Sequence, residues 1–219
     1  MTFAVHTGSI SVWTVFFVGK KAKCLGICLL LAASVWTWGL LRDRQYLNQE
    51  LIRLHVVANS DSEQDQNIKL RVRNAIVDSL TQGMADIADV QAAKKYLREN
   101  LSKIESVANT ALEAAGVDSR AVVTLCKETF DTRKYDTFTL PAGVYESLRV
   151  VIGEGQGKNW WCVAFPSLCA GATSAEFEEA AQTAGMDDTL SETLTGGLHL
   201  RFYLLDALGR AEKMCFHGK

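Results

Sequence analysis

The sequence predicts an α+β protein with a single-pass membrane segment near its amino terminus and one domain of helices packed on a largely antiparallel sheet. Three observations predict this fold class: an uncharged run at residues 24–41, helical apolar spacing from residue 60 to 116, and a strand-like period of two after residue 120. The expected order of elements after the membrane segment is β-α-α-β-β-β-β-α-β, which is typical of α+β domains.

The membrane segment is expected at residues 20–44. Its apolar run, CLGICLLLAASVWTWGLL, has 18 residues without a charge. As a helix it spans roughly 27 Å at ~1.5 Å per residue, just short of a ~30 Å hydrocarbon core. Lysines precede the run, arginines follow it, and Trp36 and Trp38 lie near its far end, where indole rings favour the headgroup level. We therefore expect residues 24–41 to contact the membrane.

The fate and orientation of this segment are less constrained. No A-x-A-like cleavage site ends the run, so we favour an uncleaved anchor; a cleaved signal that releases a secreted protein stays the alternative. Basic residues on the two sides of the run balance. The lysine cluster resembles the start of a signal peptide, so we expect the domain at residues 45–219 to lie outside the cytoplasm.

Residues 1–19 carry no charged side chain and fit neither part. We interpret them as an amino-terminal extension produced by a mis-set start codon. The net charge of −2 is the sum of two unlike parts. Residues 1–44 are basic, and the domain at residues 45–219 is acidic. This distribution lacks the basic surface that nucleic-acid binding requires.

Within the domain, a strand at residues 51–58 precedes two helices. Ser60 and Glu63 have the spacing of a capping box for the first helix. The second helix is expected at residues 87–115, with Gly116 past its end. Strands follow at 120–130, 135–140, 145–152 and 160–165, then a short helix opened by a Thr173/Glu176 capping box, and a last strand at 198–205.

The glycine-rich segment at residues 153–159 joins two expected strands. It lacks the spacing of a dinucleotide-binding loop and does not open a helix, so we expect a hairpin turn and no phosphate site.

Four cysteines lie outside the membrane run, and pairing is chemically permitted outside the cytoplasm. Cys162 and Cys169 form a disulfide only if the chain folds back between them. The alternative interpretation of these cysteines is a zinc site, although no C-x-x-C pair supports it. Its ligands would come from Cys162, Cys169, His199, Cys215 and His217.

Signatures of hydrolases are missing from the sequence. A Cys162/His55 pair is conceivable in space, and an extracytoplasmic envelope hydrolase or a wall-associated binding module stays the alternative to the function inferred below. We expect no enzyme and no cofactor. Arg53, Arg71, Arg73 and Arg149 could contact an anion or a partner, although solvated surface positions are the simpler interpretation.

Trp160 and Trp161 are adjacent residues of an expected strand, so their side chains point to opposite faces. An exposed indole is a common interface anchor. We therefore weigh a binding role for one of them against burial on both sides.

Two segments closely resemble the stage II sporulation protein R family. They are LIRLHVVANSDSEQDQNIKLRVRNAI (residues 51–76) and LPAGVYESLRVVIGEGQGKNWWCVAFPSLC (residues 140–169), in which GKNWWCV is especially specific. The resemblance covers roughly residues 45–205. This chain departs from the family at Phe130–Asp136, where the family usually has F-P-T-R-x-Y-G, and at Ser167, where it usually has a second proline.

The resemblance implies a signalling protein of endospore-forming bacteria, made in the forespore and exported towards the mother cell. There the family is thought to activate a membrane-bound aspartic protease that processes the sigma-E precursor. The resemblance and the expected turns place the contact surface at Asn59, Ser60, Asp61, Gly155, Lys158, Asn159, Trp160 and Trp161.

Overall fold

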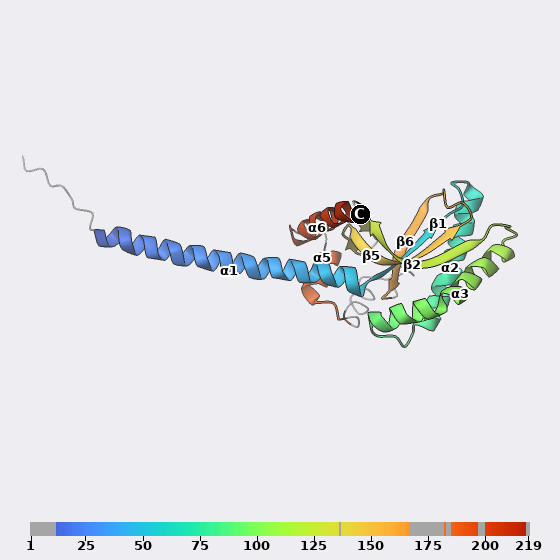
Figure 1. The fold of residues 1–219 in the computed structure, drawn as a ribbon, viewed down its shortest axis with the longest axis horizontal. Helices are drawn as coiled ribbons and strands as arrows, with labels where there is room; N and C mark the ends of the chain where they lie inside the picture. The colour runs from blue at the N-terminus through green and yellow to red at the C-terminus, as the bar shows by residue number, and fades with distance from the viewer. Residues whose placement is uncertain (1–11, 136, 167–181, 183–184, 197–199, 218–219) are drawn as a thin grey trace, which may run out of the picture. The chain divides into compact units, whose positions relative to one another are not determined.

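The computed structural model describes residues 12–135, 137–166, 182, 185–196 and 200–217, and the side chains from residue 22 onward. The chain divides into two units, residues 1–42 and 43–219, and each is described by itself. The elements in chain order (Figure 1) are α1 (Val12–Glu50), β1 (Ile52–Val57), α2 (Glu63–Gly83), α3 (Val90–Ala114), β2 (Ala121–Phe130), β3 (Arg133–Lys134), β4 (Thr139–Leu140), β5 (Gly143–Ile152), β6 (Asn159–Phe165), α5 (Asp188–Thr195) and α6 (Leu200–His217).

The first unit is the amino-terminal part of α1. The stretch Ala22–Glu50 has a window of mean hydropathy 2.0 and is long and apolar enough to cross a membrane. Only 6% of that window is buried, unlike the core helix of a soluble protein. A signal sequence would meet the same criteria, so a membrane segment or signal is what the helix supports.

The main sheet has the strand order β2-β5-β1-β6. β2 pairs antiparallel with β5, and β1 pairs antiparallel with β6, whereas β1 and β5 are parallel. The predicted α+β class with a largely antiparallel sheet is confirmed, with one parallel pair in the middle. Parallel neighbours need a long crossover, and here α2, α3 and β2 lie between β1 and β5 in the chain.

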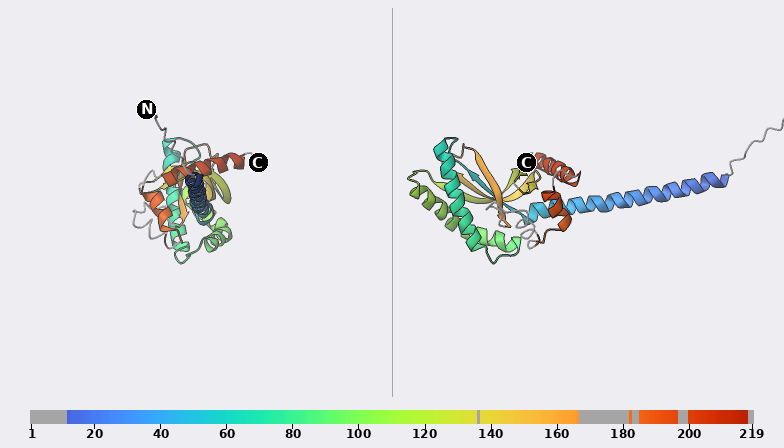
Figure 2. Two further views of the ribbon diagram at one scale, coloured as in Figure 1. Left: turned by 90° about the vertical axis from the view of Figure 1, so that its left-hand side faces the viewer. Right: turned by 180° about the vertical axis from the view of Figure 1, so that it is seen from behind.

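Helices α2 and α3 cover one face of this sheet (Figures 1 and 2). Alternate residues of β1 and β5, including Leu54, Val56 and Val150, are fully buried in the same apolar cluster as Ile76 and Leu97 of the helices. Every second residue of a strand points to the same face, and here these residues pack against the apolar stripe of the amphipathic helices. The opposite residues of each strand therefore face away from α2 and α3.

The start of α2 corrects the predicted capping box. Ser62, not Ser60, caps the helix: its side chain accepts a hydrogen bond from Asp65 N. Ser60 instead donates its hydroxyl to the Asp65 carboxylate. Two serines flank Asp61, and the spacing rule alone does not distinguish which one is in cap geometry. Helix α3 begins after a cap by Asp89 and ends at Ala114, close to the prediction.

Two predicted strands are wrong. Residues 135–140 form no single strand; β3 and β4 pair with each other in a small separate sheet. The predicted last strand at 198–205 is the start of helix α6 in its described part. Alternating apolar residues in a window of eight imitate a strand, but the same run continues to His217, too long for a typical strand. The predicted helix start at Thr173 and Glu176 lies outside the described residues.

Helix α6 is attached to the last two turns of α1, in residues that belong to the domain. Arg201 donates from Nε to Asp43 Oδ2 at 2.9 Å, and Arg44 donates from Nη2 to Glu212 Oε2 at 2.6 Å. Asn48 also donates to Glu212, at 2.9 Å. Asp43 and Arg44 are buried, so these charged hydrogen bonds are stronger than exposed ones.

Gly209 lets α6 lie directly on the backbone before β5. A Cβ at this position would collide with the Ala142 carbonyl oxygen, a backbone atom that cannot rotate away. Gly209→Ala should therefore push α6 off the sheet and lower the free energy of unfolding by about 1–3 kcal/mol, the usual cost of overpacking. Denaturant unfolding of the full chain in detergent, followed by near-UV circular dichroism, measures this. Ala207→Ser, at an exposed position of the same helix, is the control; equal stability of the two variants would contradict the packing argument.

Candidate functional site

The two predicted site segments meet at one end of the sheet. The loop after β1, residues 58–62, lies under the connection from β5 to β6, residues 153–158. Backbone hydrogen bonds join them: Gln156 N donates to Asn59 O at 3.1 Å, and Gly157 N donates to Ala58 O at 2.9 Å. Lys158 N donates to Asp61 Oδ1 at 2.7 Å. We call these two segments the loop pair.

The strand order explains why they meet. β5 and β6 do not pair with each other, because β1 lies between them. The glycine-rich connection is therefore not the hairpin turn predicted from the sequence; it crosses the carboxyl end of β1. Gly153 and Gly155 have φ values of 56° and 63°, in the left-handed region that favours glycine. A Cβ at Gly157 would collide with the Ser60 backbone, so the crossing also needs glycine for close approach.

Asn59 ties the loop pair to α2. Its Oδ1 accepts from Glu154 N at 3.0 Å, and its Nδ2 donates to Asp65 Oδ2 at 2.9 Å. Hydrogen bonds from Ser60 and Asn59 lower the pKa of Asp65. Folding therefore favours the charged carboxylate, and this stabilisation is present above the ordinary pKa of Asp65 and is lost as the pH falls through the lowered value.

Lys69 of α2 is hydrogen-bonded to the loop pair. Its side chain is buried and its Nζ donates to Lys158 O at 3.0 Å and to Gln66 Oε1 at 2.7 Å. Burial lowers the pKa of Lys69. Asn59, Ser60 and Asp61 are thus used largely inside the loop pair, whereas the side chains of Glu154, Gln156, Lys158 and Asn159 are exposed.

Trp160 and Trp161 point to opposite faces, as predicted, and both are half-buried. Trp160 packs against the core under α2, where the guanidinium of Arg73 lies 4.2 Å from its ring centroid. Trp161 stacks on His55, with centroids 5.5 Å apart, and Arg133 covers it at 3.6 Å. Each indole is therefore sandwiched by its own protein, and the arrangement is closer to burial on both sides than to one free anchor.

The face that α2 and α3 leave uncovered carries charges that the sequence did not suggest as a group. His55 Nδ1 lies 3.1 Å from Glu128 Oε1, and Arg149 Nη1 lies 3.5 Å from the same oxygen. Burial alone would raise the pKa of Glu128, but its hydrogen bond with His55 and the nearby Arg149 outweigh this and lower it. Glu128 is in register with Tyr145 on β5.

Arg53 of β1 corrects the expectation of a solvated arginine. Its side chain is fully buried. Nε donates to Cys162 O at 3.2 Å and Nη2 donates to the Tyr135 hydroxyl at 2.7 Å, while the guanidinium carbon lies 4.4 Å from the Phe130 ring centroid. The signal was visible in the strand: Arg53 and His55 alternate with Ile52, Leu54 and Val56, so both belong to the face opposite the apolar core.

The conceivable Cys162/His55 pair is wrong. Cys162 is in register with Leu54 and belongs to the apolar cluster under the helices, whereas His55 is on the other face. Cys162 is disulfide-bonded. Cys169, its predicted partner, lies outside the described residues, so that pairing stays a prediction. Cys169 and His199 of the rival zinc site lie outside them too, and the described residues hold no cluster of three or more potential metal ligands.

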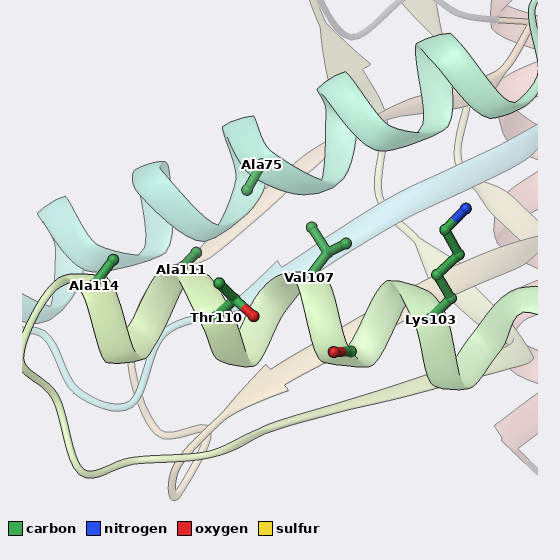
Figure 3. Close-up of a pocket in the computed structure, with 7 residues that line it drawn as sticks. Ala75, Lys103, Val107, Thr110, Ala111 and Ala114 are labelled. Carbon is green, nitrogen blue, oxygen red and sulfur yellow. The ribbon is translucent and has the colours of Figure 1, made fainter.

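A shallow groove of about 370 Å³ runs between α2 and α3 on their outer side (Figure 3). Ala75 of α2 faces Val107, Ala111 and Ala114 of α3 across it, with Lys103 at one end. Its lining is mostly small and apolar. No predicted site residue lines it.

The contribution of the loop-pair hydrogen bonds to the stability of the domain can be tested at Asn59. Asn59→Ala removes the acceptor of Glu154 N and one donor to Asp65, so the free energy of unfolding should fall by about 1–3 kcal/mol. The exposed Asn67, also near the start of α2, gives the matched control Asn67→Ala, which should change it by less than about 0.5 kcal/mol. Denaturant unfolding of the full chain measures both; equal losses would show that Asn59 does not hold the loops.

Comparison of the chain with known proteins identifies one family model and one relative that match it. The model of the family described as stage II sporulation protein R matches residues 48–175, which contain the loop pair and both tryptophans. The chain is 35% identical over 155 residues to stage II sporulation protein R of Bacillus subtilis (strain 168), covering 67% of this chain and 68% of that protein. No solved structure matches the chain. More than half of the chain fits the family model, and the chain therefore belongs to the stage II sporulation protein R family.

Proposed function

We propose that this protein is a sporulation signal exported from the forespore that activates a membrane-bound aspartic protease, which then processes the sigma-E precursor in the mother cell. The proposal rests on family membership, on an amino-terminal helix able to serve as a membrane segment or signal, and on the loop pair. The domain would act outside the cytoplasm, in the space between the forespore and mother-cell membranes.

The single observation that carries the proposed mode of action is the rigidity of the loop pair. Backbone and side-chain hydrogen bonds fix both segments, and exposed polar side chains project from them. A surface that is already ordered loses little conformational entropy on binding. Such a surface suits recognition of a partner protein.

Activation by binding has a thermodynamic requirement. The domain must bind the active state of the protease more tightly than the inactive state, because a ligand shifts an equilibrium only by its differential affinity. Glu154, Lys158 and Asn159 are the candidate contacts, since their side chains are exposed. Asn59, Ser60, Asp61 and Gly155 would position them, and the tryptophans would support β6.

An envelope hydrolase is the less favoured alternative. His55 is paired with a carboxylate, as a general base would be, but its Nε2 is buried and makes no hydrogen bond within the described residues. A base must reach the proton that it abstracts. Cys162 on the opposite face cannot serve as its nucleophile.

Charge reversal on the loop pair tests the proposal. Lys158→Glu should leave the fold intact, because only the backbone of Lys158 takes part in the loop contacts. If Lys158 is a hot spot worth about 2 kcal/mol, affinity for the protease should fall about 30-fold. The measurement is sigma-E precursor processing in sporulating cells that carry only the variant chain, together with co-purification of the protease.

Lys127→Glu is the matched control, since Lys127 is also an exposed lysine but lies in the middle of β2. It should support normal processing. Normal processing in cells lacking the chain altogether would overturn the proposed function, whereas normal processing with Lys158→Glu alone would remove only this residue from the contact surface.

A further inference from the structure

The outward side of α6 is apolar. Its exposed apolar side chains include Leu200, Tyr203 and Met214, which are 68%, 53% and 72% accessible. Ala207 and Ala211 are also exposed. At 100° per residue, positions 200, 203, 207, 211 and 214 fall within one narrow stripe of the helix. Leu208, Cys215 and Phe216 are exposed beside or beyond it.

The inward side of α6 is already satisfied by the domain. Phe202 and Leu205 are buried, Gly209 lies against Ala142, and Asp206 accepts hydrogen bonds from Ala142 N and Arg210. A surface helix of a soluble domain is normally polar on its outer side. Here apolar residues occupy both sides, so the outer stripe needs a second apolar surface.

The location of α6 indicates which surface that is. Arg201 is hydrogen-bonded to Asp43, and Glu212 to Arg44 and Asn48. Asp43 comes two residues after Leu41, the last residue of the uncharged run, in the same continuous helix. At ~1.5 Å per residue, that separation is only about 3 Å along the helix axis. The contacts therefore hold α6 against Asp43, Arg44 and Asn48, which are among the first residues of the domain after the apolar run in the chain.

The chemistry of the stripe matches a membrane interface. A tyrosine and aliphatic side chains occupy it, and two arginines flank it: Arg201, half-exposed and paired with Asp43, and Arg210, exposed and paired with Asp206. Helices that lie in the plane of a bilayer bury such an apolar face at the level of the headgroups and place basic residues beside anionic lipids. A second copy of the chain would also cover apolar residues, but only a bilayer is implied by the attachment to Asp43 and Arg44.

We propose that α6 lies on the surface of the bilayer and inserts its outer stripe, Leu200, Tyr203, Ala207, Ala211 and Met214, among the lipid headgroups. This rests on residues 24–41 being a membrane segment, as in the proposed function, but it does not depend on activation of a protease. The membrane attachment of the domain would then have two parts, the helix α1 and the face of α6.

Site-specific photocrosslinking in the full chain tests this. The photoreactive residue p-benzoylphenylalanine replaces Tyr203 or Met214, and the protein is reconstituted into vesicles of phosphatidylcholine and phosphatidylglycerol. The control position is Val122, which is also apolar and 55% accessible, at the start of β2. Val122 is in register with Val151 near the end of β5, whereas α6 contacts the residues just before β5.

After irradiation, intact-mass spectrometry identifies what each position has captured. We expect a phospholipid adduct at positions 203 and 214 and at least tenfold less at 122. A crosslinked dimer at positions 203 and 214 without lipid would show that a second copy covers α6, and would overturn the proposal. Adducts absent from all three positions, or equal at all three, would overturn it as well. Sigma-E precursor processing is a separate measurement, so failure of either proposal can be distinguished from failure of the other.

Discussion

A buried guanidinium, that of Arg53, imposes the constraint on which the face opposite α2 and α3 depends. Burying a charge without compensation is costly, and within the described part of the chain no carboxylate is bonded to this one. The Cys162 carbonyl, the Tyr135 hydroxyl and the faces of Phe130 and Tyr145 surround it instead, with the Tyr145 centroid 5.3 Å from the guanidinium carbon. These partners come from β6, β2, β5 and the segment after β3, so the contacts of Arg53 join four parts of the chain around β1. Replacing the arginine with an apolar residue would remove the reason for that arrangement, whereas losing one partner would leave a buried charge less satisfied.

On the sheet face opposite α2 and α3, the side chains around Arg53 make further contacts towards both α6 and the loop pair. Towards α6, Tyr145 donates its hydroxyl to Pro141 O, lies beneath the guanidinium of Arg44, and through Arg44 is connected to Glu212. Burial raises the pKa of the Tyr145 hydroxyl despite the two arginines, so it remains a neutral donor at physiological pH. Towards the loop pair, Phe130 contacts His55, and His55 stacks on Trp161. Because strand side chains alternate, a one-residue slip of β1 would bring Arg53 and His55 into the apolar core and displace Asn59 from the loop pair.

The sequence was most informative where local pattern and burial agree. The buried residues of α2 and α3 follow the predicted helical stripe, and β2 alternates buried and exposed residues at its start. It was misleading where tertiary contacts override local pattern. The described part of the run at residues 198–205, from Leu200 onward, is a helix with apolar residues on two sides, not a strand. The β5–β6 connection was expected to be a hairpin because neighbouring strands in the chain often pair, and no local signal shows that β1 separates them. Asn59, Ser60 and Asp61, grouped with the glycine-rich loop as one candidate contact surface, lie beside that loop, and their side chains mainly hold it. The alternation within β1 predicts the face on which Arg53 lies, but the composition of a strand does not reveal that aromatic side chains will bury that charged residue.

The two proposed surfaces are connected through β1. A single residue, Leu51, separates this strand from the end of α1, near the contacts of α6, and the six residues of the strand lead directly to the loop pair. At ~3.3 Å per residue, the five steps from Ile52 to Val57 separate the two ends of the strand by about 17 Å. Because β1 is hydrogen-bonded to a strand on each side, the loop pair is connected to the α6 end of the domain through the middle of the sheet. A helix resting on lipid would therefore do more than add affinity for the membrane. It would restrict the orientations of the domain, and with them the height at which Lys158 and its neighbours are presented. A partner anchored in a membrane has the same restriction, so limiting orientation on both sides reduces the rotational entropy lost when the two surfaces meet.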